Sequence, residues 1–179
     1  KDLKGWVMGL VMQRAGAGTL SANRITLLRD SDGDDVADLR SVLLEDLNSP
    51  FGMALVGDRF YVAHTDAVWE YDYVAGTSQI AGPGRKLTDL PAGPRNHHWT
   101  KALIASPDGS KLYALLEGAL WDEATKAPEA LDGKQFLRVL EFDVKAEQWT
   151  GRHWKYVLDA NHHAIGDFNM ISATEGLII

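Results

Sequence analysis

The protein has 179 residues, of which 25 are Asp or Glu and 18 are Lys or Arg, so its formal net charge is −7. This charge excludes a generic nucleic-acid-binding protein, because affinity for phosphates rests on clustered cations. An apolar fraction of 45% predicts a globular chain that buries a sizeable core.

Cysteine is absent, which excludes a disulfide framework, a Cys-ligated metal centre and thiol catalysis. The longest apolar run, residues 7–12, is far short of the roughly 20 residues that cross a bilayer, so we expect no membrane span. The chain begins at Lys1 rather than Met, and we expect a processed or trimmed product.

Taken in chain order, residues 24–29 and 36–44 predict a hairpin around an acidic turn. Two segments then read alike, residues 50–63 and residues 101–114. Each is a short apolar strand, a tight turn and a second strand that carries an aromatic residue. Their turns lie about 50 residues apart, which is the repeat length of a four-stranded propeller blade.

Further strands are predicted after each hairpin, at residues 67–73, 86–90, 136–144, 148–157 and 165–171. Residues 115–124 lack a sustained helical period, so no helix is expected there. The predicted fold class is therefore all-β, with about three propeller blades, roughly half of a six-bladed propeller. Because an open propeller exposes strand edges, we expect either further residues or self-association.

The acidic turn alternates carboxylates in the way that a wrapped calcium ion requires, with Asp30, Asp32, Asp34 and Asp38 as candidate ligands. Asp35 stands where such loops usually have Gly, and Ser41 replaces the usual bidentate Glu. Weak calcium binding is one interpretation. The alternative is a polar hairpin turn without an ion, because Asp and Gly favour turns in their own right.

Two histidine pairs precede predicted inner strands, His97-His98 and His162-His163. A histidine at this place can face the central channel of a propeller, where a neutral imidazole removes a hydroxyl proton from a substrate. The alternative is a histidine that packs or lies on the surface. Adjacent side chains on an extended chain point in opposite directions, so neither pair alone forms a good metal site.

Two carboxylates have a comparable placement. Glu117 ends the second hairpin, and Asp167 lies in the third inner strand. If both face the channel, they form an acid and base pair or hold a divalent cation. The alternative is a pair of solvated carboxylates at the mouth of the blades.

Residues 5–113 resemble the sorbosone dehydrogenase branch of the soluble glucose dehydrogenase family, in the strings at residues 10–18, 21–34, 96–100 and 107–113. The resemblance implies a six-bladed propeller with pyrroloquinoline quinone (PQQ) and calcium, which oxidises an aldose or sugar aldehyde in the periplasm. His98, spaced from Leu103, Pro107 and Asp108 as in that family, corresponds to the catalytic base.

Residues 112–179 resemble a different family, the phytase-like domain with esterase-like activity. The strings that carry this resemblance are residues 115–118, 136–144, 149–151 and 164–171. It implies an exported propeller that hydrolyses phosphoesters or other esters with the help of a metal. Glu117 and Asp167 fall at motif positions of this family.

The two resemblances meet near residues 112–117, inside one predicted strand. We therefore divide the chain into dehydrogenase-like blades at residues 1–113 and phytase-like blades at residues 114–179, in one continuous architecture. A junction there preserves the blade repeat, because repeat proteins exchange whole units with little damage to neighbouring contacts. The sequence on this interpretation is a chimera.

Three functional hypotheses follow. The main one is a quinone-dependent sugar dehydrogenase with His98 as base, PQQ as cofactor and calcium in the Asp30 turn. The alternative is a metal-dependent phytase-like hydrolase of phosphoesters or other esters, with Glu117 and Asp167 at its site. The third is a half-propeller that assembles or binds without catalysis. The two resemblances imply a periplasmic or secreted protein, and the first two hypotheses a sugar or phosphoester as the small-molecule partner.

Overall fold

The structure, a computed structural model, describes residues 21–93, 101–161, 163, 165–172 and 174–179. Strands and their connections make up these residues, and no helix occurs among them. Accordingly, no helix long and apolar enough for a bilayer was found in this part of the chain. The prediction of an all-β fold is confirmed.

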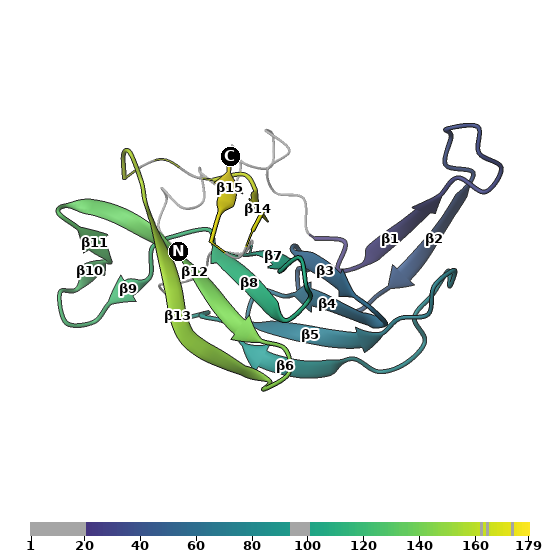
Figure 1. Ribbon diagram of the computed structural model, residues 1–179, viewed down its shortest axis with the longest axis horizontal. Helices are drawn as coiled ribbons and strands as arrows, with labels where there is room; N and C mark the ends of the chain where they lie inside the picture. The colour runs from purple at the N-terminus through teal and green to yellow at the C-terminus, as the bar shows by residue number, and fades with distance from the viewer. Residues whose placement is uncertain (1–20, 94–100, 162, 164, 173) are drawn as a thin grey trace, which may run out of the picture.

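Two antiparallel sheets form the centre of the molecule (Figure 1). The first sheet has four strands in sequence order: β3 (Met53–Val56), β4 (Arg59–Ala63), β5 (Ala67–Asp72) and β6 (Arg85–Asp89). The second sheet repeats this order with β7 (Lys101–Ala105), β8 (Lys111–Leu116), β12 (Lys134–Asp143) and β13 (Gln148–Val157).

Short strands occupy the connection between β8 and β12. They are β9 (Trp121–Asp122), β10 (Ala127–Pro128) and β11 (Ala130–Leu131), of which β11 also pairs with β12. Two hairpins flank the pair of sheets. One is formed by β1 (Ile25–Arg29) and β2 (Leu39–Leu44), the other by β14 (Phe168–Met170) and β15 (Gly176–Ile178).

The tight turn between β7 and β8 follows from its sequence. Asp108 accepts hydrogen bonds from Ser106 Oγ at 2.6 Å and from Ser110 N at 3.1 Å. These bonds lower the pKa of Asp108 to about 2. Gly109 has a φ of +71°, and a Cβ there would lie 2.6 Å from Val56 Cγ1 of the first sheet. The turn therefore requires glycine for its backbone and for the close approach of the two sheets.

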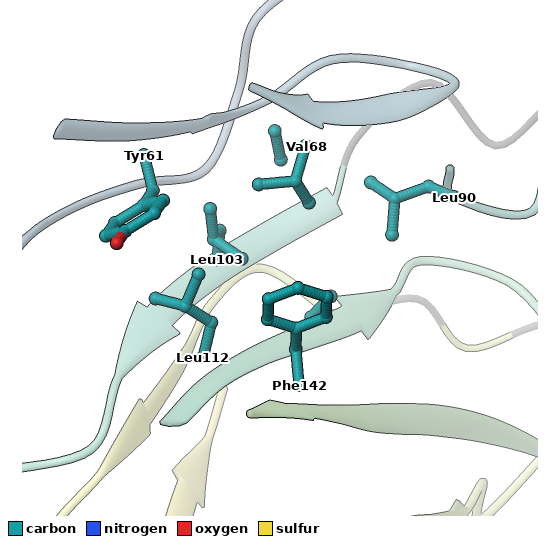
Figure 2. Close-up of a cluster of buried hydrophobic side chains, with 8 residues drawn as sticks. Tyr61, Val68, Leu90, Leu103, Leu112 and Phe142 are labelled. Carbon is teal, nitrogen blue, oxygen red and sulfur yellow. The ribbon is translucent and has the colours of Figure 1, made fainter. Parts of the chain in front are cut away.

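Three apolar layers hold the sheets together, because residues of alternate parity face opposite sides of each strand. On β4, Phe60 and Val62 pack toward the β1–β2 hairpin, whereas Tyr61 and Ala63 pack toward the second sheet. Figure 2 shows the layer between the sheets, where the labelled side chains are Tyr61, Val68, Leu90, Leu103, Leu112 and Phe142. The opposite face of β8 packs against β14 and β15.

Each sheet is thus buried on both faces by its neighbours along the chain, as blades of a propeller are. The described strands form two complete four-stranded units and two hairpins, and they do not close into a ring. The boundary predicted after residue 113 lies within β8, which pairs with β7 and β12 alike. A mixed origin of the chain and its self-association stay predictions.

Candidate functional site

The two carboxylates that the sequence singles out lie at the same place in the structure. Glu117 directly follows β8 and Asp167 directly precedes β14. Both line one small cavity of about 20 Å³, together with Phe51, Ala102, Leu115, Ile165 and Gly166. The stacking of the second sheet on the β14–β15 hairpin thereby brings together two acids that are distant in the sequence.

Backbone hydrogen bonds fix Asp167 at the start of β14. Its Oδ1 accepts a bond of 2.8 Å from Phe168 N, and its carbonyl accepts one of 3.1 Å from Ile179 N. Gly166 N donates to Ile179 O at 2.7 Å. The Asp167 carboxylate itself is exposed, so it is accessible to a molecule that enters the cavity.

Glu117 also lines a larger cavity of about 280 Å³ on the other side. Its polar and aromatic lining consists of Glu117, Trp121, Gln135, Asn161 and His163. The apolar part of its wall is formed by Ala119, Pro128, Leu137 and Leu158. Glu117 is half-buried between the two cavities, and therefore contacts both.

The side chain of Asn161 joins the two chain segments that border this larger cavity. Its Oδ1 accepts a hydrogen bond of 2.8 Å from Gln135 N, and its Nδ2 donates one of 3.3 Å to Gly133 O. The turn that follows is closed by a bond of 3.0 Å from His163 N to Ala160 O. Asn161 thus positions the segment that carries His163.

Sequence reasoning missed the roles of Asn161 and Gln135, and it named His163 only as part of a pair before the third inner strand, not as a selected site residue. A signal for His163 was present, because it precedes a third inner strand just as His98 precedes the second. No sequence pattern identified Asn161 or Gln135, since their contacts join a strand to a loop that are distant in the sequence. Their placement became apparent only from the tertiary structure.

The charged side chains that line the two cavities include carboxylates but no Lys or Arg in the described part of the chain. Glu117 lines both and Asp167 lines the smaller one, while no Lys or Arg occurs among the described residues that line either. An anionic group that enters therefore meets two carboxylates without an opposing cation from these residues. Burying an unpaired anion costs several kcal/mol, so this site by itself favours an uncharged substrate.

The predicted calcium ligands come together only in part. Carboxylate oxygens of Asp30, Asp32 and Asp34 lie within 4.8 Å of one another. Asp38 instead accepts hydrogen bonds from Ser31, from its backbone nitrogen at 2.9 Å and from its hydroxyl. Three of the four predicted ligands are thus neighbours, and the fourth closes the turn.

The backbone of this turn resembles that of a calcium loop at one position. Asp35, which stands where such loops usually have Gly, has a left-handed φ of 67°. Gly33 N donates to Asp30 at 2.7 Å, and this bond is the main cause that lowers the pKa of Asp30. The turn projects at the tip of the β1–β2 hairpin, far from β8 and β14 (Figure 1). An ion bound there does not reach Glu117 or Asp167.

His98, the predicted catalytic base, lies outside the described residues, as do His97 and His162. Its role rests on its place before a predicted inner strand and on the family resemblance. The comparisons with known proteins bear on that resemblance directly. The family model described as "Phytase-like: Esterase-like activity of phytase" matches residues 4–179. No curated protein matches the chain.

This match corrects the functional prediction. One family model runs through the residues that were assigned to sorbosone dehydrogenase as well as through the remainder. The main prediction of a quinone-dependent sugar dehydrogenase is therefore wrong, and no finding supports the PQQ that it implied. The predicted periplasmic or secreted location stays a prediction. The chain belongs to the phytase-like family described by the esterase-like activity of phytase.

Proposed function

We propose that this chain, alone or within a longer protein, hydrolyses esters at the site formed by Glu117, Asp167 and His163. One observation carries the proposal: Glu117 and Asp167 line one cavity, and Glu117 also lines the adjoining cavity with His163. Membership of a family described by esterase-like activity supports the same reaction.

Ester hydrolysis requires one group that takes a proton from water and one that returns a proton to the leaving alcohol. The oxygen of the water forms a bond to the acyl carbon, and the bond from that carbon to the alkoxy oxygen breaks. Glu117, half-buried between the cavities, is the candidate base. His163, which lines the larger cavity, is the candidate acid for an alcohol that leaves on that side.

The lining indicates which part of a substrate lies where. Pro128, Leu137 and Leu158 offer an apolar wall, and a cavity of about 280 Å³ accommodates a short acyl or aryl group. Because the described lining contains Glu117 and Asp167 but no Lys or Arg, the site favours an uncharged ester. Acetate or butyrate esters of p-nitrophenol are the appropriate probes.

Phosphoester hydrolysis is the second candidate, supported by the name of the family. A phosphate group needs positive charge that the described lining does not provide. Glu117 and Asp167 offer oxygen ligands of the type that Ca²⁺ and Mg²⁺ use, and these residues would hold the ion. When bound, such an ion supplies charge neutralisation for the phosphate. Phosphoester hydrolysis is therefore expected to depend on the cation.

The test measures release of p-nitrophenol from the acetate, the butyrate and the phosphate, with Ca²⁺ and with a chelator. Glu117→Gln and His163→Gln remove the candidate base and acid, and each is expected to lower the rate by about a hundredfold, the usual contribution of a proton-transfer group. Asp167→Asn changes a carboxylate without an assigned proton transfer and is expected to lower the rate less. Glu123→Gln and Asp159→Asn change exposed carboxylates and serve as matched controls.

Equal rates for the site variants and the wild-type chain, with unchanged circular dichroism, would contradict the proposal. Hydrolysis of the carboxylic esters in the presence of the chelator supports the first candidate. Hydrolysis of p-nitrophenyl phosphate alone, and only with Ca²⁺, supports the second.

A further inference from the structure

A third cavity shares no lining residue with the two cavities that Glu117 lines. It measures about 540 Å³ and lies between the end of β2 and the residues that follow it, His64 directly after β4, the strand β5, and the connection from β5 to β6. Its side-chain lining includes Leu43, Leu44, Leu47, His64, Trp69, Tyr71 and Ile80. A volume of this size falls within the range of small-molecule sites.

The connection between β5 and β6 forms one wall of this cavity and is held by the β1–β2 hairpin. It is longer than an ordinary hairpin loop, and long loops in compact proteins often have a function. Four hydrogen bonds of 2.8 to 3.0 Å secure it: Arg29 Nη2 to Gly76 O and to Thr77 O, Ser41 Oγ to Ser78 O, and Ile80 N to Leu43 O. The wall is therefore built into the fold.

Gly84 closes this wall at its far end. A Cβ at Gly84 would collide with the ring of Tyr71, so glycine allows the connection to approach that ring. Tyr71 is buried and also belongs to the apolar layer beneath the hairpin. An aromatic face thus borders the cavity directly.

His64 is the buried polar side chain in the described lining of this cavity. Its side chain is only 5% exposed, and its Nε2 has no hydrogen-bond partner in the part of the chain that the structure describes. The imidazole stacks on Trp69, with ring centroids 5.6 Å apart and an interplanar angle of 26°. Burial lowers the pKa of His64, which keeps the ring neutral near pH 7. A buried ring nitrogen without a partner is unfavourable, and a ligand that provides one relieves this cost.

The remaining lining selects the charge of a ligand. Glu45 and Asp46 are exposed carboxylates, Asn48 and Gln79 are amides, and no Lys or Arg is found among the described lining residues. Such a lining disfavours anions, including phosphates. Carboxylates accept hydrogen bonds from hydroxyl groups, and side-chain amides both donate to hydroxyl groups and accept from them. A hydroxyl group also suits a neutral imidazole in either tautomer, because it both donates and accepts.

We propose that this cavity binds an uncharged, hydroxyl-bearing ring of the size of a monosaccharide or disaccharide. The apolar face of the ring packs on the aromatic wall of Trp69 and Tyr71, and one hydroxyl pairs with His64 Nε2. The remaining hydroxyls contact Asn48, Gln79 and the rim carboxylates. The site is separate from the proposed hydrolytic site, and its occupancy does not depend on Glu117.

The test uses the 179-residue chain and measures ligand binding by saturation-transfer NMR and calorimetry. The probes are methyl glucoside, methyl mannoside, methyl galactoside and maltose, with glucose 6-phosphate as anionic and choline as cationic comparators. Neutral saccharides are expected to bind the wild-type chain, with a signal concentrated on one face of the ring. Glucose 6-phosphate is expected to bind at least tenfold more weakly than its neutral counterpart.

His64→Leu removes the hydrogen-bonding nitrogen and is expected to weaken binding by tenfold or more, while His64→Gln retains part of it. Since His64 is buried, a variant that fails to fold is replaced by Gln79→Ala, which lies on the exposed rim. Glu117→Gln is the matched control and leaves saccharide binding unchanged whether or not the hydrolase proposal holds. Absence of binding by every neutral saccharide, preference for the phosphate or for choline, or full binding by folded His64→Leu and Gln79→Ala would overturn the proposal.

Discussion

Tyr61 on β4 lies opposite Glu70 on β5, and Tyr61 packs in the apolar layer between the two sheets. The second sheet has the same pair, because Tyr113 on β8 lies opposite Glu141 on β12. A salt bridge accompanies each pair. Arg59, two residues before Tyr61, pairs with Asp72, two residues after Glu70. In the same way, Lys111 pairs with Asp143 in the second sheet. The repeat thus extends from backbone strands to matched polar groups, which supports the equivalence of the two sheets.

The environment of Tyr61 predicts a loss of stability at alkaline pH. Burial, followed by the charge of Glu70, raises the pKa of Tyr61 from 10.0 to about 12. Between these values the folded chain retains a proton that the unfolded chain has lost, so stability falls as pH rises through this window. The loss attributable to Tyr61 amounts to roughly 2–3 kcal/mol.

Urea unfolding at a series of pH values measures this slope. Tyr61→Phe is expected to flatten it, while Tyr156→Phe, at a site 36% exposed, serves as the control. An identical slope in the Tyr61→Phe variant and the wild-type chain would show that the proton of Tyr61 does not contribute.

Glu141 offers a second stability test. Its side chain is 6% exposed and accepts a hydrogen bond of 3.0 Å from Thr150 Oγ1. Glu141→Ala leaves the hydroxyl of the buried Tyr113 and that of Thr150 without this carboxylate, and we expect a loss of about 2 kcal/mol in the free energy of unfolding. Glu123→Ala, at a side chain 69% exposed, is expected to change it little. Equal losses in the two variants would refute the role assigned to Glu141.

Asn161 is expected to act on the proposed reaction as a positioning residue. Asn161→Ala removes its bonds to Gln135 N and Gly133 O, so the segment of His163 loses its attachment to β12. We expect kcat for p-nitrophenyl butyrate to fall about tenfold with a smaller change in KM. Asn161→Asp retains the acceptor for Gln135 N and is expected to restore part of kcat. A change confined to the unfolding midpoint would indicate a purely structural role.

The Asp30 turn is expected to bind calcium weakly. Because Asp38 is occupied by Ser31, the turn offers three neighbouring carboxylates, and weak binding in the millimolar range is expected. Calcium titration followed by amide NMR should shift residues 30–38, and Asp34→Asn should abolish the effect. Asp38→Asn should retain it. Shifts centred on Glu117 and Asp167 instead would place the ion at the hydrolytic site.

The sequence by itself determined the strands, the turns and the blade repeat. Alternating apolar residues and turns such as Pro107-Asp108-Gly109 act locally, so their pattern is readable without knowledge of the neighbours. The same holds for the acidic turn at Asp30, whose carboxylates lie within a few residues of one another. Short strings did not determine the family, because two different families could be matched to parts of the chain, and the match of one family model over residues 4–179 distinguished them.

Only the tertiary structure decided which loops meet. Glu117 and Asp167 share a cavity because the apolar face of β8, with Tyr113 and Leu115, packs against the β14–β15 hairpin. In the same way, His64 is buried because the first sheet is covered on both sides. Such packing depends on contacts between residues that are distant along the chain, and a local sequence pattern does not specify which of these faces pack together.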